Sequence, residues 1–339
     1  MKNPTKWAVP LVFVAAAALL PLAGKALPAI AGDYPLSLAR SVFTYMALAV
    51  SWDMLLRSGQ VSFGIAGFYG IGVYAAALSV LRAGFSPLAS ILFAGIIAGF
   101  IAFLLGFVIL RLRAIYFSIT TLALGEIFRI ILHNGGEFTG GAEGVIIPRI
   151  ISNNSAVLYW LSLAGVLIAI GMSAWFERSK IRFALTAIRN NELAAKSSGI
   201  GIFKYMMIAF VATSFIQGII GGIQLQGYGV ASPSDSFSGD YTLLPLAMAL
   251  LGGIHSTSGP IIGAILLGVA SEFLKLKIPY GHLIVYGFII VLVILLMPQG
   301  LYGLWRNKAR ARRVSRIDSG QASADAAARA GASKEQPRA

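Results

Sequence analysis

Residues 177–204 read ERSKIRFALTAIRNNELAAKSSGIGIFK, a polar and basic stretch between two strongly apolar segments. Its 28 residues include six lysines or arginines. Such a segment is expensive to place in the hydrocarbon core of a bilayer. Because short loops rich in lysine and arginine stay on the cytoplasmic side during insertion, the stretch predicts a cytoplasmic loop.

The composition of the whole chain is that of an integral membrane protein. Of the 339 residues, 57% are hydrophobic and only 12% are charged, whereas soluble domains carry about 25% charged residues. The net charge of +14 lies mainly in loops and in the C-terminal tail, which fits membrane orientation and not nucleic-acid binding. Cysteine is absent, so disulfides and cysteine-based metal sites are excluded. The three histidines are scattered, and we expect no metal site.

The apolar runs predict an all-α, polytopic helix bundle with about ten, at least eight, transmembrane segments. The expected segments are 7–30, 36–56, 61–81, 87–110, 114–132, 156–176, 205–227, 241–254, 259–275 and 281–297. The first resembles a secretory signal with small residues at Ala29 and Ala31, but an uncleaved span is favoured. The segments 241–254 and 259–275 are two spans or one broken element. The loop 133–155 is long enough to hold short structure of its own.

The distribution of charge predicts that both termini lie in the cytoplasm. This orientation places 20 of the 27 lysines and arginines inside and leaves an acidic set outside. We therefore expect a transmembrane domain over residues 1–305, with the cytoplasmic loop at 177–204. Residues 306–339 are expected to form a basic segment that binds anionic lipid, followed by a disordered tail.

Within the loop, apolar residues recur at roughly helical spacing, at Leu185, Ile188 and Leu193, with alanines between them. The pattern predicts one helix of about 14 residues, ended by Gly199 at the C′ position. Such a helix either lies on the lipid headgroups or docks into a soluble partner. Its apolar face is small, which favours docking.

The sequence RFALTAIRNNELAAKSSGI resembles the segment of bacterial branched-chain amino acid ABC importer permeases that meets the ATP-binding subunits. Four further stretches resemble the same family in the same order: SGQVSFGIAGFYGIGVYAAAL, TLALGEIFRIILHNGGEFTGGAEGV, LLGGIHSTSGPIIGAILL and MPQGLYGLW. The likeness covers residues 36–305 and is nearer to the M-type than to the H-type permease. Departures at Ile65, Thr186 and Ser197–Ser198 leave the substrate open.

The resemblance implies a permease subunit of a binding-protein-dependent importer in the bacterial inner membrane, with branched-chain amino acids as the default solute. It also implies an H-type second permease, two ATP-binding subunits and a periplasmic or lipid-anchored solute-binding protein. ATP would be bound by the partners, because this chain has no GxxxxGK[ST] loop, and no enzyme activity of its own is expected. The implied ATPase-coupling residues are Leu185, Ala187, Ile188, Arg189, Asn191, Glu192, Ala194, Ala195 and Gly199.

Two glycine-rich segments, 58–67 and 252–263, could serve close helix packing or line the translocation path, and both roles can hold together. The candidates for these roles include residues of both segments, and also Glu126 and the run 139–141, which lie between the segments in the sequence. The full set is Gly59, Gln60, Ser62, Gly64, Gly67, Glu126, Thr139, Gly140, Gly141, Gly252, Gly253 and Gly259.

Charged residues within the spans are costly and need partners. Glu126 and Arg129 stand at i,i+3, so mutual pairing is the simplest expectation, with contact to a zwitterionic solute as the alternative. A different class of protein stays open: a stand-alone carrier or channel in which Asp53, Glu126 and Glu272 carry protons or Na⁺. An importer of the same family for urea, amides or aromatic acids is a further alternative, and a membrane scaffold is disfavoured.

Overall fold

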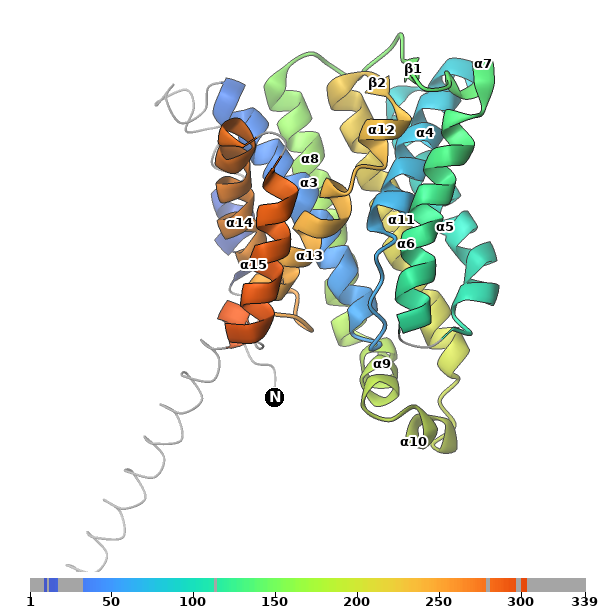
Figure 1. Ribbon diagram of the computed structural model, residues 1–339, viewed down its shortest axis with the longest axis vertical. Coiled ribbons are helices and arrows are strands. Elements are labelled where there is room, and N and C mark those ends of the chain that lie inside the picture. The colour runs from blue at the N-terminus through green and yellow to red at the C-terminus, as the bar shows by residue number, and fades with distance from the viewer. Residues whose placement is uncertain are drawn as a thin grey trace, which may run out of the picture.

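The computed structural model describes residues 9–10, 12–17, 33–112, 115–278, 281–296 and 300–303. Long helices stand side by side and one small sheet closes one end (Figure 1). This arrangement confirms the predicted all-α membrane bundle. Most of the first predicted span and the tail 306–339 lie outside the described residues.

The elements are α3 (Asp33–Leu56), α4 (Ile65–Ala83), α5 (Pro87–Ile109), α6 (Ile115–His133), α7 (Gly136–Thr139), β1 (Val145–Ile146), α8 (Ser155–Arg178), α9 (Lys180–Asn190), α10 (Glu192–Ser197), α11 (Ile202–Tyr228), β2 (Val230–Ala231), α12 (Pro233–Ser236), α13 (Asp240–Gly252), α14 (Ser258–Lys277) and α15 (His282–Leu296). Six of those described are long and apolar enough to cross a membrane: α4, α5, α6, α8, α11 and α14. The count of ten spans stays a prediction.

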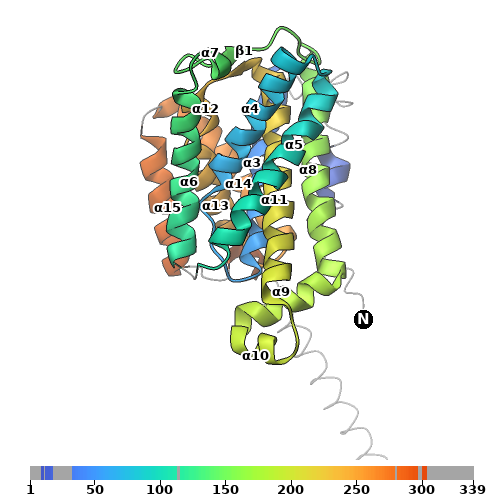
Figure 2. The ribbon, with the colours of Figure 1, turned by 90° about the vertical axis from the view of Figure 1, so that its right-hand side faces the viewer.

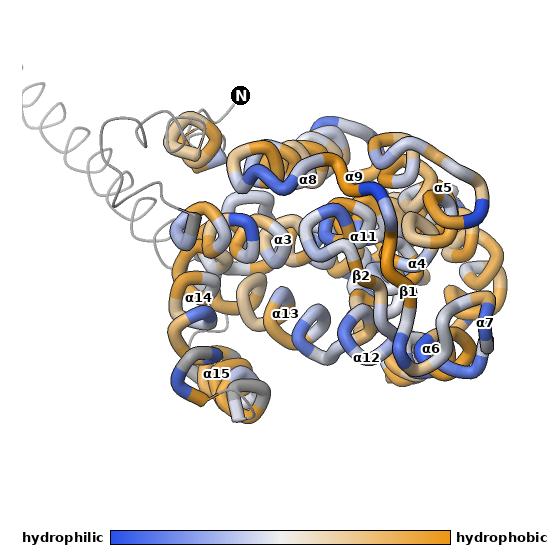
Figure 3. The backbone as a smooth tube through the Cα atoms, turned by 90° about the horizontal axis from the view of Figure 1, so that it is seen from above, coloured by the Kyte–Doolittle hydropathy of each residue, from blue (hydrophilic) through white to orange (hydrophobic). Residues whose placement is uncertain are grey.

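Helix α11 forms the centre of the bundle, and the helices differ widely in how much of them the chain itself covers. In Figure 3 α11 lies beside α3 and α4, while α5, α6 and α15 lie on the periphery. In the most apolar stretch of α11, 78% of the residues are buried, whereas in that of α6 only 11% are. Close packing at the centre depends on missing side chains, since a Cβ on Gly72 would lie 2.3 Å from the carbonyl oxygen of Gly218.

The segments 241–254 and 259–275 are two separate helices. Helix α13 has 13 residues, which gives about 20 Å of length against a hydrocarbon core of about 30 Å. It packs on α14 backbone to backbone: a Cβ on Gly263 would lie 1.8 Å from the carbonyl oxygen of Met248. The chain between them, residues 253–257, is not helical.

The long loop 133–155 holds the short structure that its length predicts. Helix α7 follows α6, and β1 pairs antiparallel with β2, with Val145 opposite Ala231. The loop after α6 is therefore joined to the segment that follows α11 at the same end of the bundle (Figure 1).

The basic stretch departs from prediction in one respect: it forms two short helices and not one of about 14 residues. The break falls at Asn191, whose backbone is extended (φ −160°, ψ 107°) and whose Oδ1 accepts a hydrogen bond from the amide of Ala194 at 3.0 Å. Asparagine favours such a capping position, so it ends α9 and starts α10. The predicted stop is confirmed: Gly199 has φ +77°, and the amide of Ile200 donates to the carbonyl of Ala195.

Candidate functional site

Helices α9 and α10 project from the end of the bundle opposite the small sheet (Figure 2). One face of α9 is buried against the bundle and carries Ile181, Ala184, Leu185 and Ile188. On the outer side, Phe183 is 74% exposed and Leu193 76% exposed. The pair of helices is thus a small unit fixed to the bundle by an apolar face, with a second apolar and polar surface left free.

The predicted coupling residues divide between these two faces. Leu185, Ile188 and Ala195 are buried within the chain, where they hold α9 and α10 in place. The exposed members are Asn191, Glu192, Ala194 and Gly199, and the partly buried members are Ala187 and Arg189. The exposed Phe183 and Leu193 belong to the same surface. Leu193 was noted in the sequence for its spacing and Phe183 was missed, because spacing alone does not say which side of a short helix the bundle covers.

Two groups of predicted residues meet in one cavity. Gly59 and Gln60, from the non-helical segment before α4, share a cavity of about 850 Å³ with Arg189, Glu192 and Gly199. Gly59 has φ +89°, and a Cβ there would lie 3.3 Å from Cγ of Arg189. The glycine-rich segment that enters α4 is therefore in contact with the end of α9.

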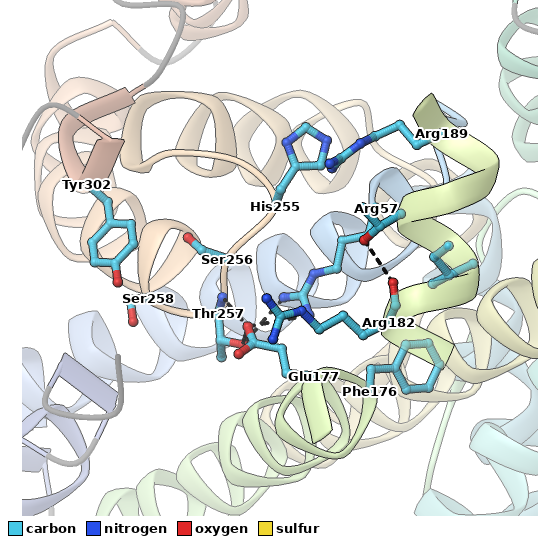
Figure 4. A pocket seen from close by; sticks show the side chains of 12 residues that line it. Arg57, Phe176, Glu177, Arg182, Arg189, His255, Ser256, Thr257, Ser258 and Tyr302 are labelled. Carbon is cyan, nitrogen blue, oxygen red and sulfur yellow. Dashed lines mark hydrogen bonds and ion pairs between the residues drawn. The ribbon is translucent and has the colours of Figure 1, made fainter. Parts of the chain in front are cut away.

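An ion network lies beside α9, between it and the loop that carries His255 and Thr257 (Figure 4). Arg57 Nε donates to Asp53 Oδ2 at 3.0 Å, and Arg57 Nη2 donates to Ser173 Oγ at 2.9 Å. Arg57 Nη1 lies 3.6 Å from Glu177 Oε1. Asp53 is fully buried and also accepts the backbone amide of His255. Both acids are thus held by one arginine at the ends of α3 and α8.

The same network holds the loop between α13 and α14. Thr257 donates to Glu177 Oε1 from its hydroxyl at 2.8 Å and from its backbone amide at 3.2 Å. His255 adopts φ +63°, a left-handed conformation that is uncommon for a residue with a side chain. In this conformation the backbone amide of His255 donates its hydrogen bond to Asp53 Oδ1. Partial burial and the nearby cations of Arg189 and Arg57 lower the pKa of His255 to about 4, so the ring is neutral at neutral pH.

Residues of this network line a cavity of about 190 Å³, and its lining also includes Arg182, Thr186 and Arg189 of α9. One local signal for the network is present in the sequence, the i,i+4 spacing of Asp53 and Arg57. Glu177 and Thr257 meet only through the tertiary fold, and no spacing reveals them.

The remaining glycine candidates make close helix contacts. A Cβ on Gly67 would lie 3.0 Å from Cα of Gly125 in α6, and one on Gly64 would lie 3.2 Å from the carbonyl oxygen of Thr121. A Cβ on Gly259 would lie 1.7 Å from the carbonyl oxygen of Gly253, and one on Gly252 would meet Gly259. These contacts account for the packing role.

Polar candidates on and around α6 lie apart from the two cavities. Arg129 Nε donates to both carboxylate oxygens of Glu126, at 2.9 and 3.0 Å, which confirms the expected pairing. Thr139 Oγ1 donates to the carbonyl of Leu132 at 2.6 Å, and Gly140 and Gly141 follow with φ +76° and +57°. This turn lies at the end opposite α9 (Figure 1). Ser62 supports the α4 entry, because its carbonyl accepts the indole N–H of Trp52 at 2.8 Å.

Comparison with known proteins identifies the family of the chain. Residues 34–295 match the family described as branched-chain amino acid transport system, permease component. The chain is 30% identical to the high-affinity branched-chain amino acid transport system permease protein LivM of Salmonella typhimurium, covering 86% of this chain and 73% of that protein. LivM of Escherichia coli is 30% identical over 79% of this chain and 70% of its own length. LivH of Escherichia coli is 24% identical over 77% and 91%.

No solved structure gives a significant match to the chain. The higher identity to LivM than to LivH agrees with the predicted M-type pattern. The chain belongs to the family of branched-chain amino acid transport permeases and is LivM-like.

Proposed function

We propose that this permease forms one half of the translocation path of a binding-protein-dependent ABC importer for branched-chain amino acids, and that α9 and α10 receive the movement of separate ATP-binding subunits. The observation that carries the proposal is the projecting unit itself: it is buried on one face, exposed at Phe183, Glu192 and Leu193, and anchored to several helices. A carrier that works alone needs no such docking surface.

The contacts of α9 supply a route for that movement. A shift of α9 presses on α8 and α11 through the buried face around Leu185 and Ile188. It also acts on the entry to α4, because Arg189 packs on Gly59. The ion network beside α9 joins the ends of α3 and α8 to the loop before α14. Closure of the ATPases would therefore move several membrane helices together and alternate the access of the path.

A second permease subunit fits against α6. This helix is apolar, but only 11% of the residues in its most apolar stretch are buried by its own chain. It carries the exposed Glu126–Arg129 pair. A charge facing lipid at mid-span costs about 2.5–3.5 kcal/mol on insertion scales, so a protein surface is the more stable neighbour for this pair. The relatives named LivM and LivH support an H-type partner.

The remaining partners would dock at the two ends of the bundle. Two ATP-binding subunits would meet α9 and α10 in the cytoplasm, and a periplasmic or lipid-anchored binding protein would deliver solute at the end that carries α7, β1 and α12. With this orientation we propose the ten-span scheme with both termini in the cytoplasm, in a bacterial inner membrane. ATP is bound by the partners, and the permease contributes no catalysis.

The stand-alone carrier has less support. Two of its three candidate ion carriers are occupied: Asp53 by Arg57 and Glu126 by Arg129. The solute is assigned from the names of the relatives, and urea, amides and aromatic acids remain as alternatives, because the binding protein selects the solute.

Reconstitution tests the proposal. The permease is placed in proteoliposomes with its second permease, its ATPases and its binding protein, and uptake of radiolabelled leucine, urea and benzoate is measured. We expect leucine uptake that requires ATP and the binding protein and that persists when ion gradients are collapsed by ionophores. Uptake by the permease without ATPases, driven by a proton or Na⁺ gradient, would refute the importer.

A further inference from the structure

Two adjoining cavities lie among α3, α4, α11, α12, α13 and α14, toward the end opposite α9 and α10. Their volumes are about 390 and 290 Å³, and both are lined by Gln224, Tyr228, Asp235 and Tyr241. None of these residues was singled out in the sequence, because they come from segments that only the fold brings together.

Three tyrosine rings form one wall of the cavities. The ring of Tyr241 stacks on Tyr69 with centroids 4.0 Å apart and on Tyr45 at 5.7 Å. Tyr45 and Tyr69 are buried, so their rings are fixed by the surrounding helices. Stacked rings offer an apolar surface to an aliphatic group and attract cations at their faces.

The other wall is rich in carboxylates. Asp235, Asp240 and Glu272 line the cavities together with one cation, Lys275. Lys275 Nζ is already engaged, since it donates to Tyr45 Oη at 2.8 Å and lies 3.6 Å from Asp240 Oδ2. Arg40 is the next cation, with its guanidinium beside Gly227. Even when Arg40 is counted, the carboxylates outnumber the cations.

We propose that the joined cavities are a transit site for solutes that carry a primary ammonium group and an aliphatic side chain. The ammonium is held by Glu272 and Asp240, the aliphatic group lies against the tyrosine wall, and Lys275 can donate to a carboxylate of the solute. A negative lining repels anions of the same size that lack the ammonium. This inference rests on the proposed function, and it adds a location and a charge preference within the permease.

The absence of cysteine from the chain makes thiol labelling a direct test. Ser41 lines the smaller cavity and is replaced in S41C, while the reference N153C places a thiol on an exposed loop residue near the same end. Both variants, in the assembled transporter without ATP, are treated with methanethiosulfonate reagents that carry either an ammonium or a sulfonate group. We expect the ammonium reagent to be preferred at S41C over N153C by roughly tenfold, as a focused negative potential predicts.

Two further arms test the residues and the solute. Adding E272Q to S41C should lower the preference, whereas E143Q, an exposed acid outside the cavities, should leave it unchanged. Leucine and 3-methylbutylamine should slow labelling of S41C, and 4-methyl-2-oxopentanoate, which lacks the ammonium, should not. A second thiol at S238C, on another lining residue, repeats the measurement if S41C does not assemble.

Equal preference at S41C and N153C, equal protection by the oxo acid, or no labelling of either cavity thiol would overturn the proposed site. These outcomes are separable from failure of the importer, because labelling needs no ATP hydrolysis and leucine uptake is measured independently.

Discussion

Arg57 Nη1 and Glu177 Oε1 lie 3.6 Å apart, at the ends of α3 and α8. The same guanidinium binds Asp53, and the same carboxylate binds Thr257. One arginine therefore compensates two acids that are largely removed from solvent, beside the helices that face the cytoplasm in our orientation. Its loss would leave uncompensated charge where three membrane elements meet.

R57Q should lower the free energy of unfolding by about 3–5 kcal/mol, the cost of removing one partner of a buried ion pair. The measurement is thermal unfolding of the purified permease in detergent. R82Q is the control, because Arg82 is exposed and donates to a backbone carbonyl at the other end of the bundle, and its effect should stay within about 0.5 kcal/mol. Equal stability of R57Q and wild type would contradict a structural role for the network.

Substitutions at the exposed Glu192 of α10 and at the partly buried Arg189 of α9 should uncouple transport from ATP hydrolysis. E192Q and R189Q should lower leucine uptake per ATP hydrolysed by about fivefold or more, as the loss of a coupling free energy of 1 kcal/mol or more predicts. Folding and membrane insertion should be intact for E192Q, since Glu192 is exposed. The measurement is uptake and phosphate release in the same proteoliposomes. An unchanged ratio in both variants would exclude this surface from coupling.

Gly263 should not tolerate even a methyl group, because a Cβ there would lie 1.8 Å from a backbone oxygen of α13. G263A should therefore destabilise the protein by about 1–3 kcal/mol through overpacking. The matched control is G171A in α8, where a Cβ would meet no described atom within 4 Å. Alanine favours helix there, so G171A should be neutral or slightly stabilising. Thermal unfolding of both variants in detergent checks the contrast.

The sequence was informative where a physical rule acts over a few residues. The glycine cap at Gly199 and the pairing of Glu126 with Arg129 both depend on local spacing, and both are confirmed. The single 14-residue helix was wrong because Asn191 can cap a new helix within a pattern that otherwise reads as continuous.

Features made by distant segments were beyond prediction from one sequence. The contact of Gly59 with Arg189 and the bond of Thr257 to Glu177 require the helices to be placed first. The tyrosine wall at Tyr69 and Tyr241 comes from α4 and α13, and its rings look like ordinary core residues in the sequence.

The exposed Glu126–Arg129 pair on α6 distinguishes a lipid-facing helix from a subunit interface. If lipid surrounds the pair, the two side chains interact only with each other. The charge-swapped variant E126R/R129E keeps an i,i+3 ion pair, so in that case it should behave as wild type. If the second permease covers α6, the swap reverses the charges that its surface meets. We expect the second case, with co-purification of the second permease reduced at least about tenfold, since mismatched charges at an interface cost several kcal/mol. The swapped protein alone should unfold at the wild-type temperature, which separates a lost interface from a damaged helix, and wild-type co-purification would assign the face of α6 to lipid.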